Sequence, residues 1–154
     1  MYKRQQLARV DHAAFAAIPL EDFLEKRWEN QGRRCKLREL TKRSNNLSDW
    51  IASYVLVQQS VALQTRAAEG FLEIAHHCME LGDYFAVASI IAGFAQWSMS
   101  RLTRLWPIRQ KHKVIHQRMN SMMSGDKNYA TYVNRLRWFI HFANSCMHAL
   151  INLT

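Results

Sequence analysis

The residues best suited to bind a metal are the adjacent pair His76 and His77, followed by Cys78, with Glu73 one turn earlier. Imidazole, thiolate and carboxylate groups are the usual ligands of zinc. Successive residues of a helix point about 100° apart, however, so His76 and His77 cannot both face one ion. No second Cys or His pair stands at zinc spacing in the chain. We therefore predict no metal site and interpret these residues as ordinary surface and edge positions.

Other titratable residues lie on predicted helices without a catalytic pairing. His112 and His116 are four residues apart, but the glutamate of an HExxH motif is missing. Glu69, Glu73 and Glu80 share part of one predicted helix. We interpret the two histidines as surface residues and the three carboxylates as a solvated helix face.

The chain has no glycine-rich loop of the kind that cradles phosphates. Neither GxxxxGK[ST] nor GxGxxG occurs, so the chain should not bind a nucleotide by those routes. No GxSxG elbow occurs either, and no Cys–His nucleophile pair can be argued from spacing. The residues themselves thus point to no covalent chemistry.

The charge balance is strongly basic, with 21 Lys and Arg against 12 Asp and Glu, a net charge of +9. Such an excess suits a nucleic acid, a membrane surface or an acidic protein partner, and the balance alone does not choose among them. The N-terminus lacks the apolar stretch of a signal peptide, and no uncharged apolar run is long enough to span a bilayer. The three cysteines, odd in number and without CxxC spacing, fit a reducing compartment.

Nucleic-acid binding is the alternative that residue types alone suggest. Basic side chains neutralise phosphates and aromatic rings stack on bases. The basic and aromatic residues that interleave here are Trp97, Arg101, Arg104, Trp106, Arg109, Lys111, His112 and Lys113. Trp97 and Trp106 adjoin apolar segments, however, where aromatic residues usually belong to the core.

Glycine (5) and proline (2) are scarce and helix-forming residues abundant, which predicts one all-α domain of six or seven helices. The expected helices span residues 4–17, 19–28, 37–58, 60–81, 84–97, 107–123 and from 127 into the tail. Ser60 and Asp83 are predicted N-caps, Gly82 a helix terminator and Pro107 a first helical residue. The helix from residue 84 is apolar almost all round, so we expect it to be fully enclosed.

Several motifs in order resemble the catalytic (CDC25-homology) domain of guanine-nucleotide exchange factors for Ras-like GTPases. The resemblance covers residues 6–137 and rests on five segments. These are QLARVDHAAFAAIPLEDFL (6–24), RSNNLSDW (43–50), FLEIAHHCMELGDYFAVASIIAGF (71–94), SRL with a following Trp106 (100–106) and KNYATY (127–132). The resemblance implies a multi-helix orthogonal bundle with Trp50, Phe71, Leu102 and Trp106 in its core.

The implied function is to promote GDP release from a Ras-family small GTPase of the Ras, Rap or Ral type. Members of the family stabilise the nucleotide-free GTPase, need no cofactor, and are not expected to bind nucleic acid. The implied location is cytoplasmic, at the inner face of the plasma membrane when bound to the GTPase. The GTPase-binding positions that the resemblance implies are Arg43, Asn45, Ser48, Tyr84, Ala88, Ala95, Arg101, Asn128 and Tyr129.

Two departures from the family pattern lead us to expect impaired or absent exchange activity. Ala95 stands where family members have an asparagine that contacts the GTPase, and a lost interface hydrogen bond costs about 1–3 kcal/mol. After residue 137 the family's proline-containing segment and helical hairpin do not follow. We therefore expect a partial exchange-factor domain at residues 1–137 and a divergent apolar helical tail at 138–154. The alternatives are a non-catalytic helical GTPase-binding or adaptor module, and a basic nucleic-acid-binding helical domain.

Overall fold

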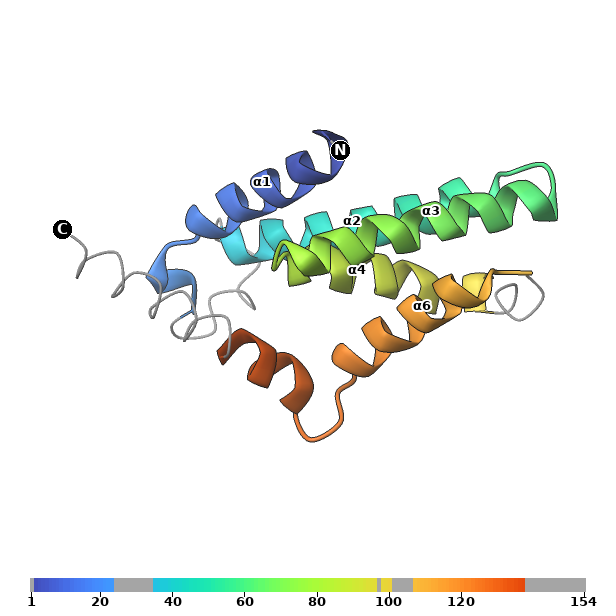
Figure 1. Ribbon diagram of the computed structural model, residues 1–154. Coiled ribbons are helices and arrows are strands. Elements are labelled where there is room, and N and C mark those ends of the chain that lie inside the picture. The colour runs from blue at the N-terminus through green and yellow to red at the C-terminus, as the bar shows by residue number, and fades with distance from the viewer. Residues whose placement is uncertain (1, 24–34, 97, 101–106, 138–154) are drawn as a thin grey trace. The chain divides into compact units, whose positions relative to one another are not determined.

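The computed structural model describes residues 2–23, 35–96, 98–100 and 107–137. Within these ranges all regular structure is helical, which confirms the all-α prediction (Figure 1). The labelled elements are α1 (Tyr2–Ala16), η1 (Leu20–Phe23), α2 (Lys36–Leu56), α3 (Val61–Glu80), α4 (Tyr84–Ala95) and α6 (Gln110–Met122). The chain divides into two compact units, residues 1–116 and 117–154, and each is described by itself.

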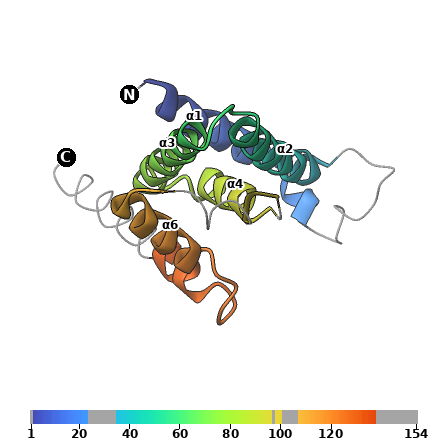
Figure 2. The same cartoon turned by 90° about the vertical axis from the view of Figure 1, so that its right-hand side faces the viewer.

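Helix α4 packs against both α2 and α3 (Figure 2). Where α4 meets α2, serine and glycine residues lie in the contact. The hydroxyl of Ser48 donates to the carbonyl oxygen of Ser89 at 2.7 Å, and the hydroxyls of Ser44 and Ser89 lie 2.6 Å apart. A Cβ atom placed on Gly93 would come within 3.0 Å of the Ser48 carbonyl oxygen. A larger residue at position 93 would therefore push the two backbones apart.

The break between α3 and α4 is set by local chemistry, as the sequence predicts. Gly82 ends α3 with a φ of 76°, a left-handed conformation that glycine adopts without strain. Asp83 then caps α4 by accepting the backbone N–H of Ala86 at 3.1 Å. At the start of α3, Ser60 accepts the N–H of Leu63 at 3.3 Å. All three predicted helix-end residues are confirmed.

The N-terminus of α2 is capped from a distance. The buried carboxylate of Asp22 accepts the backbone N–H groups of Lys36 at 2.5 Å and Leu37 at 3.3 Å. Asp22 lies in η1, where the sequence predicts a helix start, whereas the predicted helix end near Trp28 lies outside the described residues. A side chain 14 residues upstream thus takes the part that an N-cap residue usually plays.

The core of the first unit combines the predicted apolar face of α3, most of α4, and Leu40, Ile51, Ala52 and Val55 of α2. The α3 residues that the sequence predicts to be buried, and that are buried, are Ala68, Phe71, Leu72, Ala75, Cys78 and Met79. Full enclosure of α4 is wrong, because Ala88, Ala92 and Ala95 are exposed. They recur at helical spacing along the side that neither α2 nor α3 covers.

A core position for Trp50 is also wrong. Its side chain is 54% exposed and lies edge-on to Phe71, with ring centroids 5.6 Å apart. The neighbouring Tyr54 is exposed too, as is Val57 at the end of the hairpin. Residues 50–65 contain no charged side chain, so this end of the α2–α3 pair, called here the hairpin tip, is apolar and exposed. Leu102 and Trp106, also expected in the core, lie outside the described residues.

In the second unit, residues 117–122 complete α6, a turn follows, and residues 130–137 are helical. Lys127, Asn128 and Tyr129 all have φ angles between 50° and 58°. This left-handed backbone is incompatible with the predicted helix start at Lys127, so that prediction is wrong. Among the described helices none is both long and apolar enough to cross a membrane. The tail at 138–154 lies outside the described residues.

Candidate functional site

Helix α2 separates two residues that the family resemblance places on one surface. Arg43 and Asn45 are two residues apart, so their side chains leave the helix about 200° from each other. Arg43 donates through Nε to the buried carboxylate of Asp11 in α1 at 2.9 Å. Asn45 is exposed on the other side. The structure therefore ties Arg43 to α1 and leaves Asn45 accessible.

Two further predicted contact residues are buried. Ser48 is 5% exposed, and its hydroxyl donates to backbone carbonyl oxygens of Ser44 and Ser89. Tyr84, in the first turn of α4, is also 5% exposed. Both side chains are therefore buried in this chain, where Ser48 joins α2 to α4.

The exposed side of α4 is a row of alanines. Ala88, Ala92 and Ala95 recur at i, i+4 and i+7 and share one face of the helix. We call these three residues the alanine face. Small apolar side chains let the backbone of another protein approach a helix closely, and the face itself offers no group for acid–base chemistry.

Polar residues lie beside the end of this face. Gln96, next to Ala95, donates to the carboxylate of Asp49 in α2 at 2.7 Å. Asn45 is one turn from Asp49 and lies on the same side of α2. The structure therefore brings three of the predicted positions, Asn45, Ala88 and Ala95, to one exposed region spanning α2 and α4.

The other predicted positions cannot be joined to this region. Arg101 lies outside the described residues, as do Trp97 and Arg104. Asn128 and Tyr129 belong to the second unit, where both are exposed on the left-handed turn.

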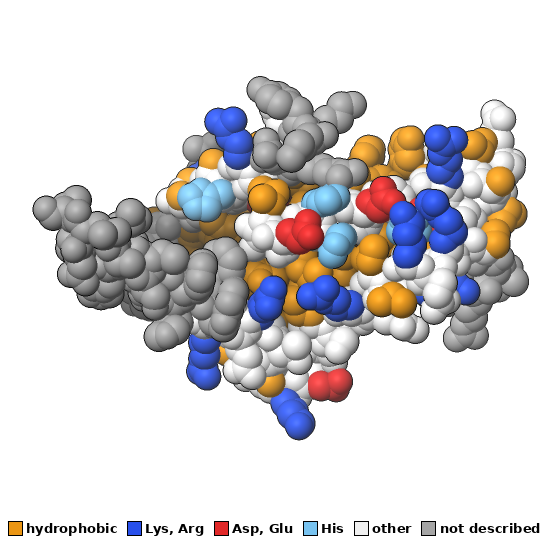
Figure 3. All heavy atoms as spheres, in the orientation of Figure 1, with side chains coloured by type: hydrophobic (Ala, Val, Ile, Leu, Met, Phe, Trp, Pro, Cys, Tyr) orange, Lys and Arg blue, Asp and Glu red, His pale blue; other side chains and the backbone are white. Residues whose placement is uncertain are grey.

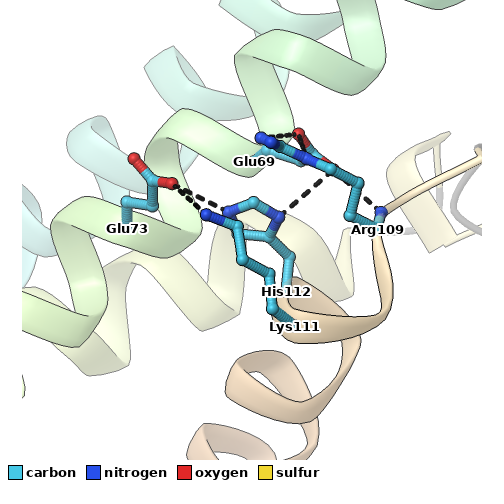
Figure 4. Close-up of polar contacts among 5 residues, drawn as sticks. All are labelled: Glu69, Glu73, Arg109, Lys111 and His112. Carbon is cyan, nitrogen blue, oxygen red and sulfur yellow. Dashed lines mark hydrogen bonds and ion pairs between the residues drawn. The ribbon is translucent and has the colours of Figure 1, made fainter.

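Sequence reasoning missed a charged cluster that joins α3 to the start of α6. Its members are Glu69, Glu73, Arg109, Lys111 and His112 (Figure 4). Glu69 accepts the backbone N–H of Arg109 at 2.8 Å and its Nε–H at 2.8 Å. Lys111 reaches Glu73 at 3.3 Å.

The cluster also fixes where α6 begins. A first helical position for Pro107 is wrong, because α6 starts at Gln110. The carboxylate of Glu69 holds the N–H of Arg109, the residue just before the helix, and negative charge at a helix N-terminus is favourable. A tertiary contact therefore overrides the local preference of proline.

The interpretation of His112 and Glu69 as surface residues is wrong. His112 is completely buried, and Glu69 is 6% exposed. Nε2 of His112 lies 2.9 Å from Glu73 Oε1 within hydrogen-bond distance, and Nδ1 lies 3.2 Å from Glu69 Oε1 without forming a hydrogen bond. The sequence does contain two carboxylates one helical turn apart, Glu69 and Glu73, and a basic run near residue 110. Spacing alone, however, cannot predict that two segments about 40 residues apart pair with each other.

The electrostatics indicate a structural ion network rather than an acid–base pair. The hydrogen bond from the Arg109 side chain, followed by its backbone N–H and the charge of His112, lowers the pKa of Glu69 to about 2 despite the opposing effect of burial. Hydrogen bonds from His112 and then Lys111 lower the pKa of Glu73. Both carboxylates are therefore ionised near neutral pH.

The ion pairs of the histidines and basic residues also affect two hypotheses from the sequence, a metal site and nucleic-acid binding. His76 and His77 both contact Glu80, at 3.6 and 2.9 Å, and the described residues contain no group of three potential metal ligands. Arg109 and Lys111 are each paired with a carboxylate, which partly offsets the charge they could offer to a phosphate. On the face drawn in Figure 3, acidic and histidine side chains lie among the Lys and Arg side chains.

Comparison with known proteins identifies the family. A family model described as the RasGEF domain matches residues 5–149. The chain is 27% identical over 135 residues to Ras guanine nucleotide exchange factor D of Dictyostelium discoideum, and 26% identical over 137 residues to mouse Ras-specific guanine nucleotide-releasing factor 1. It is 21% identical over 137 residues to Cell division control protein 25 of Saccharomyces cerevisiae. Each alignment covers 86% of this chain but only 20%, 11% and 9% of the respective relative. The match over nearly the whole chain shows that it belongs to the RasGEF domain family.

Proposed function

We propose that this domain binds a small GTPase of the Ras, Rap or Ral type and promotes release of its GDP. The observation that carries the proposal is the RasGEF match over residues 5–149, supported by relatives whose names describe Ras exchange or releasing factors. Such an activity needs no covalent step. A protein that binds the nucleotide-free GTPase more tightly than the loaded one must, by linkage, weaken nucleotide binding by the same factor. We place this activity in the cytoplasm, at the inner face of the plasma membrane where the GTPase is membrane-bound.

The alanine face of α4, with Asn45 beside it, is the surface that we propose for the GTPase. It is exposed and apolar, and its side chains are small enough for close approach. Arg43, Ser48 and Tyr84 would act beneath it, because their contacts hold α1, α2 and α4 together.

Release of a fluorescent GDP analogue from Ras, Rap and Ral proteins tests the proposal. The domain should accelerate release from at least one of them. Ala88→Arg places a long charged side chain on the alanine face and should abolish the acceleration. Ala62→Arg, at an exposed alanine of α3 away from this face, is the matched control and should retain it. Equal loss in both variants, or no acceleration of any GTPase by the domain, would contradict the proposal.

The second candidate is a GTPase-binding module without exchange activity, which Ala95 favours. If Ala95 lacks an amide that the interface needs, Ala95→Asn should raise the release rate roughly tenfold, from a hydrogen bond of about 1–3 kcal/mol. Ala62→Asn is the control for a new surface amide. Tight binding of the nucleotide-free GTPase, with no release by the wild type or by Ala95→Asn, would instead support the non-catalytic module.

A further inference from the structure

Asp49 is the only charged residue in the two stretches of sequence that contribute Asn45 and the alanine face. No other Lys, Arg, Asp or Glu occurs in residues 44–65 or 84–100, although charged residues make up 21% of the chain. Asp49 is exposed and lies one turn after Asn45 on the same side of α2. In a chain with a net charge of +9, the one charge in these stretches is therefore negative.

The contacts of Asp49 leave its carboxylate able to accept a cation. Oδ1 accepts the side-chain N–H of Gln96 at 2.7 Å. This neutral amide does not offset the charge of a carboxylate, and an ionised carboxyl group can accept about four hydrogen bonds. Asp49 forms no ion pair within the part of the chain that the structure describes. Lys42, the basic residue on the same side of α2, is two turns or about 10 Å away along the helix axis.

The end of α4 adds to the negative potential around Asp49. Helix α4 ends at Ala95, and Gln96 is its C-cap residue. The carbonyl groups of a last helical turn carry a partial negative charge, which favours a cation close to that turn. The hydrogen bond from Gln96 holds this helix end next to Asp49. Two sources of negative potential, one on each helix, therefore attract a positive group to the same edge of the alanine face.

We infer that Asp49 determines which GTPases the domain accepts, by forming an ion pair with a lysine or arginine that the GTPase presents beside the alanine face. The inference rests on the proposed exchange function and specifies the charge that the partner carries at this place. Close approach of the GTPase over Ala92 and Ala95 excludes water from the pair, which strengthens it relative to a pair on a free surface. A GTPase with a neutral or acidic residue there is a poorer substrate.

Asp49→Asn separates the charge from the hydrogen bond to Gln96, because the amide oxygen of asparagine can still accept that bond. With the GTPase on which the wild-type domain is most active, Asp49→Asn should slow the release of a fluorescent GDP analogue about fivefold. Asp49→Lys should slow it about tenfold or more, since like charges then meet. Rising ionic strength should slow release by the wild type more than release by Asp49→Asn.

Glu80→Gln and Glu80→Lys are the matched controls. They change the net charge by the same amounts at an exposed carboxylate of α3 that pairs with His76 and His77. Both should keep the wild-type rate. An active wild type whose rate is unchanged in Asp49→Asn, or reduced equally in Glu80→Gln, would overturn the inference and leave the proposed function standing. A wild type that accelerates release from no GTPase would overturn both.

Charge reversal on the GTPase tests the pair from the other side. Exposed lysines and arginines of the GTPase are replaced by glutamate one at a time, and each variant is assayed with Asp49→Lys. At least one replacement should restore release to within about threefold of the wild-type pair, as expected for two residues in direct contact. The same replacement should slow release by the wild-type domain. Restoration by none of them would contradict the ion pair.

Discussion

The hairpin tip and the carboxylates of the charged cluster lie on the same α2–α3 helix pair. Apolar side chains are usually buried and charged ones exposed, but the tip exposes apolar side chains and the cluster buries a charged one. At the tip, Trp50 and Val57 are 54% and 74% exposed. A few turns along α3, Glu69 is almost fully buried beside His112. The difference shows that partners, and not polarity alone, decide burial here. The carboxylate is buried because several donors converge on it, whereas the rings at the tip contact one another and leave their outer faces to solvent.

The largest expected effect in this comparison is the removal of the Glu69 charge. Glu69→Gln should destabilise the fold by about 2 kcal/mol, because it weakens charge-assisted bonds to Arg109 and His112 and leaves a buried donor poorly matched. Urea denaturation would measure the change. Glu80→Gln is the control, since Glu80 is more than half exposed and should change stability by less than about 0.5 kcal/mol. Equal effects of the two substitutions would mean that the cluster adds nothing beyond a surface ion pair.

Acid should weaken the same contacts without a substitution. The pKa of Glu69 is lowered from 4.5 to about 2, so its contribution to stability is present above pH 4.5 and is lost as the pH falls towards 2. The effect should be no larger than that of Glu69→Gln, because both changes remove the same charge and both leave one oxygen that can accept a hydrogen bond. Unfolding followed between these pH values would show a steeper loss in the wild type than in Glu69→Gln. Parallel curves would contradict the assignment.

At the hairpin tip the expected cost is lower. Trp50→Ala should destabilise the protein by about 1 kcal/mol, the worth of its edge-to-face contact with Phe71. The measurement is again urea denaturation. A loss of 3 kcal/mol or more, typical of a core aromatic residue, would show that Trp50 is buried in solution.

The smallest effect should come from Val57. Because its side chain is 74% exposed, Val57→Ser should change the free energy of unfolding by less than about 0.5 kcal/mol. The substitution should also raise solubility, since it interrupts an exposed apolar patch. A clear loss of stability would mean that this residue has a packing role.

Local chemistry explains which parts of the fold were predictable. Ser60, Gly82 and Asp83 act on backbone groups within a few residues, so their roles can be seen in the sequence. The buried stripe of α3 follows from helical spacing in the same way. Pro107 has an equally clear local preference, but the contact between Glu69 and Arg109 prevails.

The candidate site was less predictable, because its geometry depends on pairings across long sequence separations. Arg43, Asn45 and Ser48 belong to one sequence motif, but their side chains leave α2 in different directions. Arg43 contacts α1, Asn45 is exposed to solvent, and Ser48 contacts α4. His112 is buried against Glu73, which lies 39 residues earlier in the sequence, and against Glu69. Nothing in the spacing of either segment specifies that they meet.

The distant cap at the start of α2 has a consequence for chain entropy. By binding the N–H groups of Lys36 and Leu37, Asp22 pins together the two ends of the connection between η1 and α2. Each doubling of such a closed loop costs only about 0.6 kcal/mol. Residues inserted between positions 24 and 34 should thus leave the rest of the fold intact as long as Asp22 is kept. A tag or reporter inserted there should leave both Asp22 contacts in place.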